Sequence, residues 1–427
     1  MLFSSILAVT TPQCAASAHE FKILYEFCTQ ENCFDGENPQ SQLVEDKHGN
    51  LYGTTLGGGE YLGGTVFKLT ADGAETILYN FCKGGRDCGK GFGPGSNLIL
   101  DKKGDIFGTT EGGGKSDCAT PDGCGTVFRL TPDGGSLSLH RFEGYPDGAV
   151  PLSGVIADSL GNIFGTTVSG GSGEVCASYG DDIGCGTVFE LQPHHVESVV
   201  YKFCSLSGCA DGYAPYAGLV ADGAGNFYGT TSAGGSNGWG TIFKIAGGGE
   251  TVLYNFCSQK GCVDGADPRA GLIIDGSGNF YGTTVAGGRS SSSCNVGCGT
   301  VFKLTPDGTE TVLYSFCADT NCSDGAGPTG GVVINSTGDL FGTTQGGGDF
   351  NCRCGTVFEI SPDGTETVLH AFRGGANNNG GDGALPYAGL IIDARGNLFG
   401  TTYQGGFTGG GNSCGGAGCG TVFKVAQ

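Results

Sequence analysis

Short runs of β-branched and aromatic residues alternate with clusters of Gly, Asp, Asn and Pro along most of the chain. Four such runs form a unit, and the unit recurs about every 50 to 60 residues. In one clear unit the first run is 270–275 and the fourth is 310–316. The runs are too short for helices and are bounded by turn residues, so each unit predicts four antiparallel strands joined in sequence.

Two markers identify the second and third runs of each unit. The second run contains an aromatic residue followed by Gly-Thr-Thr, with its Gly at 53, 108, 165, 229, 282, 342 and 400. The third run reads Gly-Thr-(Val/Ile)-Phe, with its Phe at 67, 128, 189, 243, 302, 358 and 423. Seven units of four short strands predict an all-β fold, a seven-bladed β-propeller of four-stranded antiparallel blades.

The two ends of the chain complete one blade. The last unit stops after its third run, at 421–425, whereas residues 21–27 resemble the fourth run of the other units. A ring closed by this N-terminal strand leaves no exposed blade edge. We therefore predict that residues 22–27 pair with residues 421–425.

The first eighteen residues resemble a secretion signal. The segment 2–9 is apolar, and Ala16, Ser17 and Ala18 form a small-residue cleavage site before His19. No apolar run approaches the roughly 18 residues that a membrane helix requires. We expect a signal peptide at 1–18 and one propeller domain at 19–427, secreted or periplasmic and monomeric.

Composition narrows the class of partner. Of the 427 residues, 87 are Gly, too few for collagen and too many for a helical bundle. The 21 basic and 42 acidic residues give a net charge of −21, which argues against nucleic acid or an anionic membrane as partner. Acidic sugars would also be repelled overall unless a local basic patch receives them, so the expected partner is an extracellular glycan or a protein.

The cysteines occur in local couples, and units that lack one member lack both. Such couples in an exported chain predict disulfides, because the spacing supplies no zinc knuckles. Cys352 and Cys354 stay open, since a bridge across one residue is strained. The predicted couples are Cys28 and Cys33, Cys82 and Cys88, Cys118 and Cys124, Cys176 and Cys185, Cys204 and Cys209, Cys257 and Cys262, Cys294 and Cys298, Cys317 and Cys322, and Cys414 and Cys419.

A second motif, Asp-Gly-x-x-Pro, precedes the first run of most units. Its Asp occupies positions 35, 147, 211, 264, 324 and 382, and Lys90 takes the equivalent place in the second unit. A ring of carboxylates near the axis would suit Ca²⁺, whereas a residue repeated in nearly every blade more simply forms an Asx turn in its own crossover. We expect no metal and no cofactor. His140 and His370 replace a Tyr of the fourth run, as packing variants.

Residues that break the repeat are the candidates for function. The loops between the second and third runs vary from 8 to 18 residues, and the residues after the crossover Pro and after Gly-Thr-Thr also vary. Aromatic faces and polar groups at these positions would suit a sugar, although each residue alone also fits packing or solvent exposure. The candidate ligand-binding residues are Trp239, Tyr216, Tyr387, Tyr403, Arg269, Gln345 and Glu111.

No Ser/His/Asp or Cys/His catalytic arrangement is evident, so an extracellular binding or interaction propeller, for carbohydrate, is the first hypothesis. The alternative is a polysaccharide lyase or glycoside hydrolase that uses carboxylates and aromatics on the same face. The carboxylates of the variable loops are Glu111, Asp181, Asp182 and Asp349.

The repeat itself resembles a known one. The sequence from Gly-Asn through Tyr-Gly-Thr-Thr to Gly-Thr-Val-Phe-Lys-Leu-Thr-Pro-Asp-Gly-Thr-Glu-Thr-Val-Leu-Tyr, clear at 272–316, resembles the GloVer-type tandem repeat of exported bacterial proteins. Members often carry a C-terminal anchor, and this chain ends inside its last blade, so the resemblance implies a freely secreted or periplasmic protein. It implies no assigned activity and supplies no catalytic residues.

Overall fold

The computed structural model describes residues 19–83, 88–115, 123–171, 176, 184–193, 196–291, 294–349, 351–374, 381–407, 414 and 417–427. The predicted signal segment 1–18, Cys118, Asp181 and Asp182 lie outside these residues. No helix within the described ranges is long and apolar enough to cross a membrane.

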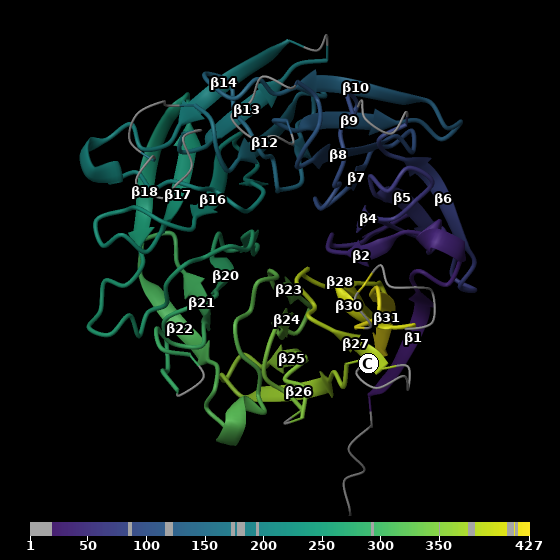
Figure 1. The fold of residues 1–427 in the computed structure, drawn as a ribbon. Coiled ribbons are helices and arrows are strands. Elements are labelled where there is room, and N and C mark those ends of the chain that lie inside the picture. Colours follow the sequence, from purple (N-terminus) through teal and green to yellow (C-terminus); the bar gives the residue numbers. More distant parts are fainter. Residues whose placement is uncertain are drawn as a thin grey trace, which may run out of the picture.

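Seven antiparallel sheets stand around a central axis, as predicted (Figure 1). The innermost strands are β3 (Val44–Glu45), β7 (Ile99–Leu100), β11 (Ile156–Ala157), β15 (Val220–Ala221), β19 (Ile273–Ile274), β23 (Val333–Ile334) and β28 (Ile391–Ile392). The second strands are β4 (Leu51–Gly57), β8 (Ile106–Thr110), β12 (Ile163–Thr167), β16 (Phe227–Thr231), β20 (Phe280–Thr284), β24 (Leu340–Thr344) and β29 (Leu398–Thr402).

The third strands are β5 (Thr65–Leu69), β9 (Thr126–Leu130), β13 (Thr187–Leu191), β17 (Thr241–Ala246), β21 (Thr300–Leu304), β25 (Thr356–Ile360) and β31 (Thr421–Ala426). The outermost strands are β6 (Glu75–Asn80), β10 (Ser136–Arg141), β14 (Glu197–Lys202), β18 (Gly249–Asn255), β22 (Glu310–Ser315), β26 (Glu366–Ala371) and β1 (Glu20–Glu26). We number the blades 1 to 7 from the blade of β4 to the blade of β29.

The ring closes through the two ends of the chain. Strand β1 pairs antiparallel with β31, with Lys22 opposite Lys424 and Glu26 opposite Thr421, and the two strands lie side by side in Figure 1. The backbone N–H of Phe27 also donates to the Gly420 carbonyl at 3.0 Å. The predicted pairing of 22–27 with 421–425 is confirmed.

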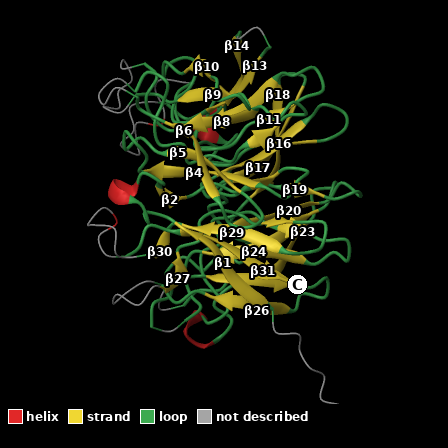
Figure 2. Cartoon of the chain, turned by 90° about the vertical axis from the view of Figure 1, so that its right-hand side faces the viewer, coloured by secondary structure: helices red, strands yellow, loops and turns green. Residues whose placement is uncertain are grey.

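The crossovers and long loops gather on one face. Short elements on this face are β2 (Glu37–Pro39), β27 (Gly381–Ala384), β30 (Gln404–Gly406) and the 3₁₀ turns η1 (Glu31–Cys33), η3 (Ser207–Cys209) and η4 (Thr320–Cys322). The side view shows the helical turns and the β27–β30 ribbon at the edge of the ring opposite the C-terminal end of β31 (Figure 2). We call this edge the loop face.

Phenylalanine pairs fill the spaces between blades. Each outermost strand is followed by a Phe that packs edge-to-face against the third-strand Phe of the next blade, with ring centroids 4.9–5.2 Å apart. Phe27 and Phe67 form this contact where blade 7 meets blade 1. Both rings are fully buried. The core is therefore a ring of equivalent contacts, and the terminal strand supplies one of them.

The Gly-Thr-Thr motif has three separate structural roles. Its Gly lies under the third-strand Phe, since a Cβ there would approach the ring to 2.5–2.7 Å in every blade. The second Thr bonds the Thr that begins the third strand, with hydroxyl oxygens 2.8–2.9 Å apart. The first Thr donates to a carbonyl of the next blade in six blades, and one of these six, Thr401, closes the ring on the Ser41 carbonyl.

Gly282→Ala is expected to destabilise the protein by about 1–3 kcal/mol, because the new methyl group would lie 2.7 Å from Cζ of Phe302 in a packed core. Gly276→Ala is the matched control, since nothing lies within 4 Å of a Cβ at that turn position. Urea denaturation of both variants measures the difference in the free energy of unfolding. Equal stabilities would contradict the packing role.

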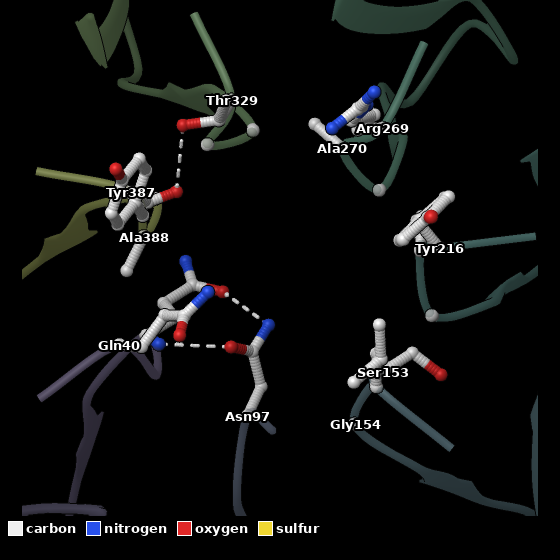
Figure 3. Close-up of a pocket in the computed structure, with 18 of the residues that line it drawn as sticks. Gln40, Asn97, Ser153, Gly154, Tyr216, Arg269, Ala270, Thr329, Tyr387 and Ala388 are labelled. Atoms are coloured by element: carbon white, nitrogen blue, oxygen red, sulfur yellow. Dashed lines mark hydrogen bonds between the residues drawn. The ribbon is translucent and has the colours of Figure 1, made fainter. Parts of the chain in front are cut away.

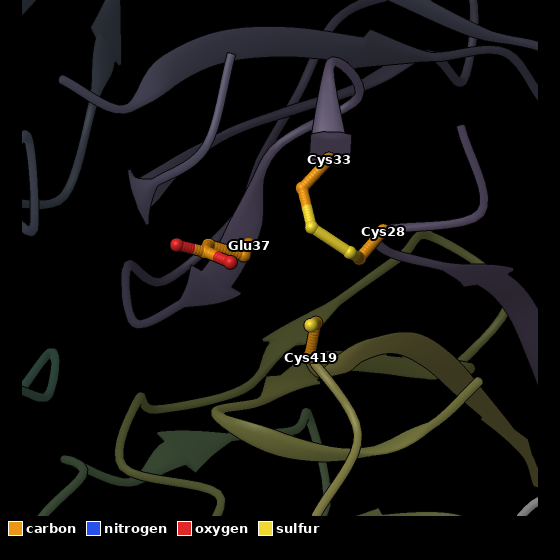
Figure 4. Close-up of side chains that lie close together, drawn as sticks. All are labelled: Cys28, Cys33, Glu37 and Cys419. Atoms are coloured by element: carbon orange, nitrogen blue, oxygen red, sulfur yellow. A yellow bond between two sulfur atoms is a disulfide. The ribbon is translucent and has the colours of Figure 1, made fainter. Parts of the chain in front are cut away.

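The cysteine couples are confirmed wherever the structure describes both members. Nine disulfides are present among the described residues, and one of them joins Cys352 to Cys354, the couple that the sequence left open. The couple of Cys118 and Cys124 stays a prediction, because Cys118 lies outside the described residues. Where the ring closes, the Cys28–Cys33 disulfide lies beside Cys419, whose partner is Cys414 (Figure 4).

Candidate functional site

A cavity of about 600 Å³ lies on the axis of the propeller. The residue that follows the crossover Pro lines it in every blade: Gln40, Gly95, Leu152, Tyr216, Arg269, Thr329 and Tyr387. Figure 3 shows Tyr387 on one side of the opening and Tyr216 with Arg269 on the other. The innermost strands are only two residues long. The crossover residues that precede them therefore also lie at the axis.

Polar side chains hold the wall of this cavity together across blade boundaries. The backbone N–H of Gln42 donates to Oδ1 of Asn97 at 2.8 Å, and Nδ2 of Asn97 donates to Oε1 of Gln42 at 3.3 Å. The Thr329 hydroxyl donates to the Tyr387 carbonyl at 3.2 Å. The lining therefore combines neutral amide and hydroxyl groups with the charged side chains of Glu111 and Arg269.

A second cavity of about 380 Å³ adjoins the first, between the loops of blades 3 and 4. We call it the loop pocket. Trp239 and Tyr213 line it, and Tyr216 and Arg269 line both the loop pocket and the central cavity. Trp239 is 37% exposed, so part of its indole faces solvent. An aromatic surface thus continues from the axis onto the loop face.

Arg269 is fixed between the two cavities. Its Nη2 lies 2.9 Å from Oδ2 of Asp267, and its guanidinium lies 5.3 Å from the centre of the Tyr216 ring. Burial alone would lower the pKa of Arg269, but the hydrogen bond and charge of Asp267 outweigh it and raise that pKa. The ion pair and the cation–π contact therefore hold a charged donor in one orientation.

The candidate residues divide between the two cavities. Gln345, Glu111 and Tyr387 line the central cavity, and Trp239 lines the loop pocket. Tyr403 lines neither, but packs edge-to-face against Tyr387 with ring centroids 5.4 Å apart. Burial, with a smaller contribution from Tyr403, raises the pKa of Tyr387.

Sequence reasoning missed several lining residues. Tyr213 and Asp267 occupy the variable positions inside the Asp-Gly-x-x-Pro motif, and Asn97 stands just before an innermost strand. The variation of those two positions from unit to unit was the signal that would have found Tyr213 and Asp267. Gln42 and Asn97 had no comparable signal, because their role depends on contacts between blades.

The family model of the Gloeobacter/Verrucomicrobia repeat matches residues 10–208 and 175–414. The chain belongs to this repeat family. A search of curated protein sequences finds no match.

Solved structures similar to this Gloeobacter/Verrucomicrobia repeat protein share its fold at low sequence identity. A streptogramin B lyase structure has a TM-score of 0.55 at 12% identity, over 95% of this chain and 97% of that one. Virginiamycin B lyase from Staphylococcus aureus has a TM-score of 0.54 at 11% identity, over 96% and 100%. A fungal alcohol oxidase of the AA5 family, in complex with copper, has a TM-score of 0.53 at 13% identity, over 96% and 76%.

The repeated aspartates of the Gloeobacter/Verrucomicrobia repeat act as caps and do not form a ring at the axis. Oδ2 of Asp264 accepts hydrogen bonds from the Tyr254 hydroxyl and the Ser258 backbone N–H, both at 2.8 Å. Asp35, Asp211 and Asp324 accept equivalent bonds from the outermost strand and its crossover. These aspartates therefore cap their own crossovers, as expected of a residue repeated in nearly every blade. The cap differs from an Asx turn, because the N–H groups that donate to Asp264 belong to Ser258 and Gln259, which precede it.

Proposed function

We propose that this repeat protein is an exported binding propeller that takes a neutral oligosaccharide across the central cavity and the loop pocket. The observation that carries this proposal is the continuity of the two cavities through Tyr216 and Arg269. A chain of sugar units would extend from the axis, past these two side chains, to Trp239.

The chemistry of the lining supports a sugar. The apolar faces of pyranose rings stack on aromatic side chains, and their hydroxyls exchange hydrogen bonds with amides and charged groups. Tyr216, Tyr387 and Trp239 supply the rings, and Asn97 and Arg269 supply polar partners. The net charge of −21 favours a neutral ligand over an acidic one.

Export is part of the proposal. Disulfides form and persist in oxidising compartments, and nine are present in the described part of this chain. They staple the crossovers and long loops of the loop face, where the ligand would bind. A secreted or periplasmic location follows from this redox requirement.

Hydrolysis or elimination is the alternative use of the same face. A pair of carboxylates flanking the scissile bond would be required for hydrolysis. Glu111 and Asp267 are the carboxylates among the described lining residues, and Asp267 is ion-paired with Arg269. The geometry therefore favours binding, and the release of sugar from a polysaccharide panel would favour the enzyme.

Tyr216→Ala is expected to weaken glycan binding by about tenfold or more, because this ring borders both cavities. Trp239→Ala reports on the loop pocket alone, and Tyr387→Ala on the central cavity alone. A glycan array selects the ligand, and isothermal titration calorimetry then measures the Kd of each variant.

Leu160→Ala is the control for these measurements. Leu160 is 78% exposed and lies in the turn between β11 and β12, on the face opposite the loop face, so its removal should leave the Kd unchanged. Unchanged glycan affinity in all three aromatic variants would refute the proposed site.

A further inference from the structure

The outer rim of the propeller carries a repeated cluster between neighbouring blades. In four gaps a Tyr of one outermost strand and the Asp of the following crossover face a Glu that begins the next outermost strand. Tyr254, Asp264 and Glu310 are one example, with the Tyr254 hydroxyl 2.8 Å from Asp264 and 3.5 Å from Glu310. One Oε atom of each such Glu is buried without a hydrogen-bond partner among the described residues.

The gap between blades 2 and 3 differs by a single residue type. His140 replaces the Tyr, while Asp147 and Glu197 keep the two carboxylates. Nε2 of His140 lies 3.1 Å from Oδ2 of Asp147, and one ligand atom from each of the three side chains lies within 4.8 Å of the others. Oε1 of Glu197 is buried without a partner among the described residues.

We propose that His140, Asp147 and Glu197 form a binding site for a divalent transition-metal ion of the zinc class. An imidazole nitrogen with two carboxylate oxygens suits Zn²⁺, at bond lengths of about 2.0–2.2 Å. The ligand atoms are already close enough that small side-chain rotations bring them to one ion. The fourth position is open to water, because the His140 and Asp147 side chains are 17% and 14% exposed.

The surroundings fit a bound cation. The backbone N–H of Glu143 donates to Oδ1 of Asp147 at 3.0 Å, which fixes this carboxylate and leaves Oδ2 directed at His140. Lys202, at the other end of β14, lies over the ring of Tyr145, at 5.7 Å from its centre, and its charge also acts on Glu197. Two carboxylates balance the charge of a divalent ion, and the ion would tie blade 2 to blade 3 at the rim.

The gap between blades 6 and 7 provides a natural comparison. His370 lies 2.9 Å from Asp382, as in the proposed site, but Phe21 occupies the place of the Glu. The Phe21 ring stacks on the His370 imidazole, with centroids 3.6 Å apart and planes inclined by 6°. No third ligand faces His370 and Asp382 among the described residues, and we assign this gap no metal.

The experiment measures zinc bound per chain after equilibrium dialysis of the untagged, chelator-treated protein against Zn²⁺, by elemental analysis. His140→Tyr restores the side-chain set of the four other gaps, so it should fold normally and bind one zinc fewer than the wild type. Glu197→Gln, the second loss variant, should also bind one fewer. Phe21→Glu completes a second His-Asp-Glu set and should bind one zinc more.

Thermal denaturation confirms that each variant is folded, so that a change in zinc content reports on the site and not on unfolding. Zinc should raise the Tm of the wild type more than that of His140→Tyr, because the ion binds the folded state. Equal zinc content in the wild type and both loss variants would overturn the site. Failure of Phe21→Glu to gain a zinc would overturn the claim that these three side chains are sufficient.

Discussion

A chain that lacks residues 19–27 is expected to lose cooperative folding. Strand β1 is the outermost strand of blade 7, and its removal leaves β31 as an exposed edge. It also removes Phe27, which is fully buried against Phe67 of blade 1. Loss of a buried Phe side chain alone costs about 3–5 kcal/mol, against a total stability of about 5–15 kcal/mol for typical domains.

A circular permutant separates two effects: the loss of strand β1 itself, and the loss of its place at the N-terminal end of the chain. Glu20 pairs with Ala426, so a short turn such as Thr-Pro-Asp-Gly would join the C-terminus to residue 19, and the new chain would begin at Cys28. This permutant keeps every blade contact and should unfold at a Tm close to that of the wild type. Calorimetry and circular dichroism of both chains provide the measurement. A truncated chain as stable as the permutant would refute the closure argument.

The fold could be predicted from the sequence because the markers of the second and third strands recur in all seven units. The positions of Gly282, Phe302 and their equivalents located the second and third strands, and the incomplete last unit located the closing strand at 21–27. What the pattern did not reveal was the physical reason for the motif. The Gly282–Phe302 contact and the hydrogen bond from Thr283 to the Gly330 carbonyl become visible only in the three-dimensional structure.

The candidate site was harder to predict, for a geometric reason. The seven residues after the crossover Pro all line one cavity, whereas Tyr403, one of the residues after Gly-Thr-Thr, lines neither cavity. Nothing in the sequence separates Trp239, in the loop pocket, from Tyr387, across the axis. The distance between two such side chains depends on which blades carry them and on the path of each loop. Neither can be deduced from the type of residue at the position.

The glutamates between blades should make stability depend on pH. Burial, reinforced by the facing aspartate, raises the pKa of Glu75, Glu250, Glu310 and Glu366 to about 7. Where Lys90 replaces the aspartate, Ser136 replaces the glutamate and accepts a hydrogen bond from Nζ of Lys90 at 3.2 Å. Both carboxyl groups are thus replaced in this gap, whereas in the gap between blades 6 and 7 Phe21 replaces the glutamate alone and Asp382 stays.

The sign of the effect follows from linkage. An acid whose folded pKa lies above its unfolded value binds more protons in the folded state, so the free energy of unfolding falls as pH rises from about 4.5 to about 7. The stabilising contribution is complete below that window and lost above it. Solvent screening reduces the effect for these half-exposed groups to about 1 kcal/mol each. Aspartates such as Asp46, whose pKa is lowered to about 2, lose their contribution only at more acidic pH.

A quadruple Glu→Gln variant at positions 75, 250, 310 and 366 tests this prediction. The amide resembles the protonated carboxyl, so the variant should match the wild type near pH 4.5 and exceed its stability by about 4 kcal/mol near pH 8. Urea denaturation at both pH values measures the difference, and groups common to both chains cancel in the comparison. A stability difference that does not change with pH would show that the pKa of these glutamates is the same in the folded and unfolded protein.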